Sequence, residues 1–241
     1  MYVISYLITC LYSFIICLKL EVSFKYSFSI AYYADILKKA FDFFSTQFIQ
    51  QAFNWVTLLI TAYLISEIDT GGINIIVKYI SLTSLFLLVT NAYKGPEYTY
   101  LFAEGEIKKL NQSISSNTRF IVLCSTPLII IMMIFPSFFL GLFSIKYVHL
   151  SNVFLVMLIG TLVNTFCGSV GMLMQMTQQQ TRFRNIMFIA LLLHIILSFI
   201  LSKGYGVLGL GVSLAIVMIY WNIHSSIILQ RKHGVISYFK F

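Results

Sequence analysis

Charge is scarce in this chain of 241 residues, of which 10% are Asp, Glu, Lys or Arg and 59% are hydrophobic. An ordinary soluble domain has roughly 25% charged residues, so this sequence has too few charges to cover a water-facing surface. We therefore exclude a single water-soluble domain. A bilayer core about 30 Å thick needs roughly 20 apolar residues in helical form, and we expect a bundle of membrane-spanning helices.

Negatively charged side chains are rarer than positively charged ones, with eight Asp and Glu against sixteen Lys and Arg. All eight acids fall outside the apolar segments or at their edges, whereas a membrane-embedded active site would need some of them inside. The four cysteines lie in apolar runs without CxxC spacing, which argues against a zinc site or a disulfide framework. We expect no catalytic residues, no metal and no cofactor, and hence no enzyme.

One glycine motif has to be set aside. Gly204, Gly206 and Gly209 spell GxGxxG, but the dinucleotide-binding version follows a strand in a soluble βαβ unit. Here apolar segments of helical length stand on both sides. We interpret the glycines as a tight outer turn that opens a packed helix.

The apolar segments predict an all-α, polytopic membrane helix bundle of about seven spans, one helix followed by a six-helix lobe. We divide the chain into a transmembrane helix at 1–20, an amphipathic cytoplasmic linker at 21–46, a six-helix transmembrane lobe at 47–230 and a basic cytoplasmic tail at 231–241. Residues 94–119 are expected to form the longest polar connection, and Pro127 and Pro136 to kink the span that follows. The seven spans are expected at about 1–18, 47–66, 73–93, 120–143, 150–174, 186–202 and 207–229.

The basic residues predict the orientation. With the N-terminus outside and the C-terminus in the cytoplasm, every Lys and Arg falls on the inner side except Lys78, Lys146 and Lys203. Such an asymmetry is the signature of the positive-inside rule. We therefore interpret the net charge of +8 as a topology signal and expect no nucleic-acid partner.

Two polar stripes mark the candidate site. Amides and hydroxyls recur every three or four residues along the second span, from Gln47 to Thr61, and a matching stripe runs along the third span from Asn74 to Asn91. Such stripes face other helices or a hydrated cavity, and both interpretations stay open. The candidate cavity residues are Gln47, Gln50, Gln51, Asn54, Lys78 and Ser81.

Two ionisable residues within the spans allow more than one interpretation. Lys78 lies close enough to the outer boundary for its ammonium to reach water, or it faces a cavity and binds an anionic substrate. His194 lies mid-span and is either a neutral histidine hydrogen-bonded to a neighbouring helix or a proton-linked residue.

Three segments carry a family resemblance. GYGVLGLGVSLAIVMIYWN with its basic tail, GSVGMLMQMTQQQTRFRN before it, and GGINIIVKYISL with the following KGPEYTYLFAEGEIKKL resemble the second lobe of bacterial polysaccharide flippases. These O-antigen and oligosaccharide-unit translocases belong to the superfamily that also holds multidrug and toxin exporters. The resemblance covers about residues 40–241.

The resemblance implies a function and a location. It implies translocation of undecaprenyl pyrophosphate-linked oligosaccharide units across the bacterial inner membrane for surface polysaccharide, such as lipopolysaccharide, with the lipid-linked oligosaccharide and membrane lipids as partners. Family members have about twelve to fourteen helices, so we expect a truncated or half-length flippase that lacks an N-terminal lobe or pairs with a second copy. The alternatives are a fragment of a multidrug or cation exporter and a membrane enzyme of polysaccharide assembly, such as a polymerase.

Overall fold

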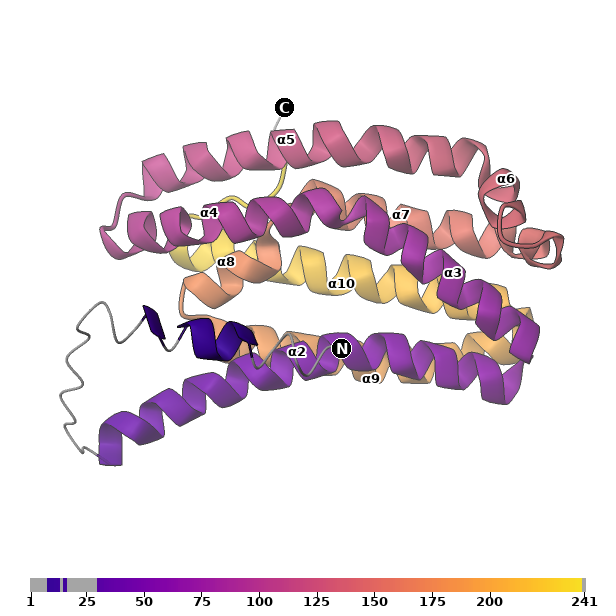
Figure 1. Cartoon of the computed structure of the whole chain (residues 1–241), viewed down its shortest axis with the longest axis horizontal. Helices are drawn as coiled ribbons and strands as arrows, with labels where there is room; N and C mark the ends of the chain where they lie inside the picture. The colour runs from indigo at the N-terminus through magenta and orange to yellow at the C-terminus, as the bar shows by residue number, and fades with distance from the viewer. Residues whose placement is uncertain (1–7, 14, 17–29, 240–241) are drawn as a thin grey trace. The chain divides into compact units, whose positions relative to one another are not determined.

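The computed structural model describes residues 8–13, 15–16 and 30–239, and all regular structure in these ranges is helical, which confirms the all-α class. Two compact units are distinguished, Met1–Lys38 and Lys39–Phe241, and the apolar clusters and cavities belong to the second. The predicted span at 1–18 and the start of the linker lie largely outside the described residues. The helices are α2 (Ile30–Leu64), α3 (Glu67–Thr83), α4 (Leu85–Ala103), α5 (Ile107–Ile134), α6 (Pro136–Gly141), the 3-10 helix η1 (Ile145–Leu150), α7 (Ser151–Cys167), α8 (Val170–Met176), α9 (Gln180–Tyr205) and α10 (Val207–His233) (Figure 1).

The helices long and apolar enough to cross a membrane number four within the described residues: Ile107–Ile134, Ile145–Cys167, Gln180–Tyr205 and Val207–His233. A fifth crossing results if α3 and α4, which meet at an angle of 43°, form one bent span. The predicted count of seven is therefore matched only roughly. α2 covers the predicted second span but is not among these apolar helices, because its stripe of amides lowers its hydropathy.

The predicted polar connection at 94–119 is wrong. α4 continues to Ala103 and α5 begins at Ile107, so only a three-residue turn with Gly105 at φ +73° separates them. The first turns of α5 are helical because Leu110, Ile114 and Ile121 recur at helical spacing and are fully or almost fully buried. The fourth span consequently starts before residue 120, and it ends at Ile134, because Pro136 begins the short α6.

The predicted fifth span is interrupted. α7 ends at Cys167, and Gly168 takes a φ of +63°, which favours glycine. A Cβ at Gly168 would lie only 2.6 Å from Thr118 Oγ1, so the close packing of α5 on this turn also requires glycine. The chain restarts as α8 at Val170, and the break leaves Gly168 and Ser169 between two helices.

α10 packs along both α7 and α9, and these contacts are the most extensive between helices (Figure 1). At the crossing with α7, a Cβ on Gly160 would lie 3.0 Å from the Cα of Ala215. The small residue thus lets the two backbones approach closely.

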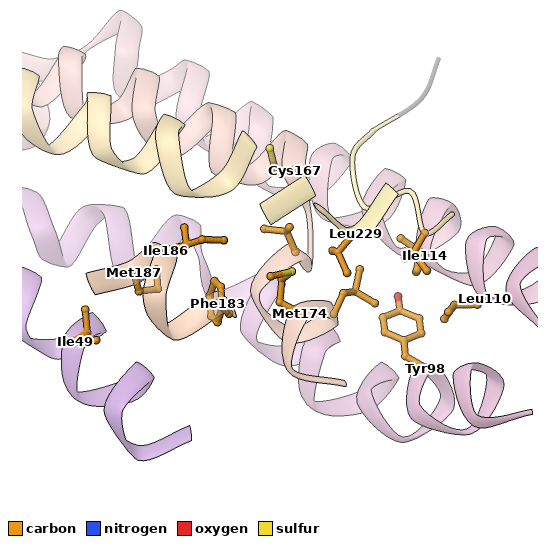
Figure 2. Close-up of a cluster of buried hydrophobic side chains, with 13 residues drawn as sticks. Ile49, Tyr98, Leu110, Ile114, Cys167, Met174, Phe183, Ile186, Met187 and Leu229 are labelled. Carbon is orange, nitrogen blue, oxygen red and sulfur yellow. The ribbon is translucent and has the colours of Figure 1, made fainter. Parts of the chain in front are cut away.

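Two clusters of buried apolar side chains hold this unit together. One gathers residues of α2, α4, α5, α8, α9 and α10, including Tyr98, Met174 and Phe183, and Figure 2 shows it. The other joins α3, α5, α7 and neighbouring elements around Ile73, Ile129 and Phe154. Between them they leave room for a polar cavity.

Candidate functional site

A cavity of about 710 Å³ opens among α2, α3, α4, α7, α8, α9 and α10. It borders both apolar clusters, since Met187 belongs to the first cluster and Met157 to the second, and both line it. None of the described residues in its lining is acidic, basic or a histidine. Its polar lining consists of Gln47, Gln50, Asn54, Ser81, Ser84, Asn91, Asn164, Ser169 and Gln175.

The polar stripe of α2 forms one wall of this cavity. Gln47, Gln50 and Asn54 are spaced three and four residues apart, which places their side chains on one face of the helix. Gln51 follows Gln50 by one residue, a rotation of about 100°, and is exposed outside the cavity lining.

α3 and α4 supply the opposite stripe. Ser81 lines the cavity, as do Ser84 and Asn91 of the stripe predicted in the third span. Lys78 lies on an exposed face of α3 and is not part of the lining. Of the six candidate residues, the structure thus brings Gln47, Gln50, Asn54 and Ser81 together and leaves Gln51 and Lys78 outside.

The break between α7 and α8 adds polar groups that the sequence did not single out. Ser169 and Gln175 line the cavity beside Asn164. Ser169 is 2% exposed, and its Oγ has no hydrogen-bond partner among the described residues; the same holds for the buried Oδ1 of Asn91. A buried polar group without a partner costs about 1–3 kcal/mol, so these two side chains gain if a rotation brings their polar atoms to water or a polar ligand in the cavity. The Gly168-Ser169 pair was the available signal, because it interrupts an apolar run.

A flat aromatic surface completes the wall. Trp221 of α10 lines the cavity, and its ring lies edge-on to Phe183, with ring centroids 5.9 Å apart. Met172 and Met218 also contribute to the lining. The cavity therefore offers amides, hydroxyls and an aromatic face, with flexible thioethers between them.

His194 of α9 is fully buried and is not part of the cavity lining. Its Nε2 lies 3.0 Å from Thr57 Oγ1 on α2, and its Nδ1 lies 2.9 Å from Ser213 Oγ on α10. The ring centroid of Phe53, which lines the cavity, lies 5.8 Å from the ring centroid of His194. His194 is hydrogen-bonded to its neighbouring helices, as one of the two interpretations had it; a proton-linked role stays a prediction.

An ion pair that the sequence did not reveal joins α2 to α9. Asp42 is 3% exposed and accepts hydrogen bonds from Arg184 and from the hydroxyl of Thr181. Asp42 therefore lies at a buried contact between helices, and the prediction that residues 21–46 form an amphipathic cytoplasmic linker stays a prediction. Asp42, Thr46 and Ile49 are all buried and share one face, so the buried face of α2 extends back to the carboxylate; this spacing was the signal that could have found it.

No family model matches the chain, and searches of curated proteins and of solved structures find no match.

Proposed function

We propose that this chain forms a lobe of a bacterial polysaccharide flippase and that its cavity receives the sugar part of a lipid-linked oligosaccharide during transfer across the inner membrane. In this proposal the C-terminus is cytoplasmic and the N-terminus lies outside. One observation carries the proposal: a cavity of about 710 Å³ in which amides, hydroxyls and an indole stand among apolar side chains, with no charged residue among the described residues of its lining.

The lining chemistry suits a sugar. A sugar hydroxyl both donates and accepts hydrogen bonds, and the side-chain amides of Gln50, Asn54 and Asn91 do the same. The indole of Trp221 can lie against the apolar C–H face of a pyranose ring. The volume falls within the range of about 300–1,000 Å³ that is usual for small-molecule sites.

The same lining disfavours the alternatives. A cation in an apolar surrounding needs a carboxylate or an aromatic cage, and a polymerase needs reactive acids or bases. The described acid that is most deeply buried, Asp42, is engaged by Arg184 outside the cavity. A neutral, hydroxyl-rich ligand fits the lining better than a cationic drug.

Binding to the purified chain in lipid nanodiscs tests the proposal. Native mass spectrometry would compare undecaprenyl pyrophosphate with and without a neutral oligosaccharide, for the wild type, Gln50→Leu and Asn54→Leu. Each lost hydrogen bond is worth about 0.5–1.5 kcal/mol, so we expect each variant to bind the glycosylated lipid roughly two- to tenfold more weakly and the bare carrier unchanged.

Gln51→Leu is the matched control, because it removes the same amide from the adjacent position of α2, outside the cavity. Its affinity should equal that of the wild type. Equal binding of the glycosylated and bare carriers by the wild-type chain would contradict the proposal, as would an equal loss in Gln51→Leu.

A further inference from the structure

A second cavity, of about 440 Å³, lies along the N-terminal half of α5. It shares no lining residue with the larger cavity. Its lining combines α5 with the segment that follows α10: Asn111, Gln112, Ser115, Ser116, Arg119, Ile236 and Tyr238.

The C-terminal segment forms a fixed wall of this cavity. α10 ends at His233, and the φ of +65° at the following Gly234 turns the chain away from the helix. The side chain of Asn111 then donates to Gly234 O at 2.8 Å and accepts from Ile236 N at 2.9 Å, and Thr118 Oγ1 donates to Ser237 O at 3.1 Å. Three hydrogen bonds thus hold residues 234–237 against α5.

The free polar groups of the cavity lie on one face of α5. Gln112, Ser116 and Arg119 are spaced four and three residues apart, so their side chains point the same way. Arg119 and Ser116 are exposed, and within the described residues the side chain of neither takes part in a hydrogen bond or an ion pair. No described residue of the lining is acidic, so the guanidinium of Arg119 has no counter-charge inside the cavity.

This set of groups matches a phosphate. Arg presents several N–H donors in a planar fork that fits phosphate oxygens, and hydroxyl and amide N–H groups add further donors. The location agrees with this chemistry. α5 has 28 residues and a length of about 42 Å, roughly 12 Å more than a hydrocarbon core of about 30 Å. With this excess at the N-terminal end, Asn111 and Gln112 lie at the depth of the lipid phosphates. Arg119 is about 18 Å from the start of α5, about 6 Å inside the core, a depth from which a long arginine side chain reaches the phosphates.

We propose that the cavity formed by Arg119, Gln112, Ser115 and Ser116 of α5 and by the docked C-terminal segment binds a phosphate group. The group is supplied either by an anionic phospholipid at the membrane boundary or by a soluble phosphate. The site is independent of the proposed function, because it neither borders the larger cavity nor requires a sugar.

Binding by the purified full chain in a neutral detergent separates the two sources. One arm titrates phosphatidylglycerol and phosphatidylcholine and counts bound lipid by native mass spectrometry; the other titrates inorganic phosphate and pyrophosphate by calorimetry. We expect Arg119→Gln to weaken binding of the phosphate-bearing ligand about tenfold or more, because a charge-assisted contact is among the strong ones, and Ser116→Ala to weaken it about threefold.

Lys108→Gln is the matched control, because it removes the same charge from an exposed position of α5 outside the lining. Preference for phosphatidylglycerol over phosphatidylcholine without phosphate binding assigns the site to a lipid, whereas saturable binding of inorganic phosphate or pyrophosphate assigns it to a soluble ligand. Binding in both arms that is unaffected by Arg119→Gln, or an equal loss in Lys108→Gln, would overturn the proposal. Size-exclusion profiles of the variants must match that of the wild type.

Discussion

The substitution Gly209→Ala probes the turn between α9 and α10. Gly209 lies in the first turn of α10, where the chain folds back against the end of α9. A Cβ at this position would lie 2.3 Å from the carbonyl oxygen of Leu201 and 2.8 Å from the backbone N of Ser202. These are backbone atoms, so no side-chain rotation can relieve the overlap. The two helices would have to separate by about 1 Å to reach an ordinary contact distance.

The size of the effect follows from two opposing contributions. Overpacking costs about 1–3 kcal/mol, and the upper end applies because only a movement of backbone relieves the contact. Replacing glycine by alanine in a helix returns about 1 kcal/mol. The net loss is about 2 kcal/mol, which for a chain of this size lowers the unfolding midpoint by about 4–8 °C.

Gly204→Ala is the control for this experiment. Nothing lies within 4 Å of a Cβ at Gly204, so only the gain in helix propensity remains, and the midpoint should rise by about 2–4 °C. The assay is thermal unfolding of the detergent-solubilised chain, followed by tryptophan fluorescence. A midpoint for Gly209→Ala equal to or above that of Gly204→Ala would refute the packing argument.

Two further predictions concern buried polar groups. Asp42→Ala leaves Arg184 without its ion-pair partner and should destabilise the chain by about 2–3 kcal/mol. Because the two residues act as a pair, the double variant Asp42→Ala/Arg184→Ala should lose less stability than the sum of the single variants. Additive shifts of the unfolding midpoint would contradict the pairing. His194→Leu removes the hydrogen bonds with Thr57 and Ser213. Such interhelical hydrogen bonds average about 0.6 kcal/mol in membranes, so we expect the free energy of unfolding to fall by about 1 kcal/mol. His194→Gln should restore part of this loss. A wild-type midpoint for His194→Leu would show that this network does not stabilise the bundle.

Part of the site was predictable because helical periodicity is a local property. The spacing of Gln47, Gln50 and Asn54 places them on one face in any helix, and such a face avoids lipid. The same reasoning failed for Gln51 and Lys78, because residues at the margin of a stripe turn inward or outward according to which helix packs beside them. For Ser169 the sequence offered only the interruption of an apolar run at Gly168-Ser169, because its place in the cavity depends on contacts of this break with α5 and the C-terminal segment, which are far away along the chain.

Composition and periodicity alone determined that this is an all-α chain rich in apolar helices. They placed both ends of α10 and the end of α9 within four residues of the observed ends, whereas α9 begins six residues before the predicted span. These ends carry strong signals, with Gly206 between the two helices and Gly234 after the basic residues that end α10. Tertiary structure alone decided that residues 107–119 are helical and that Asp42 is buried. It also decided which polar stripes share a cavity. Each of these outcomes depends on contacts between segments far apart in the sequence, and such contacts override local polarity when they bury one face of a helix or pair its charge.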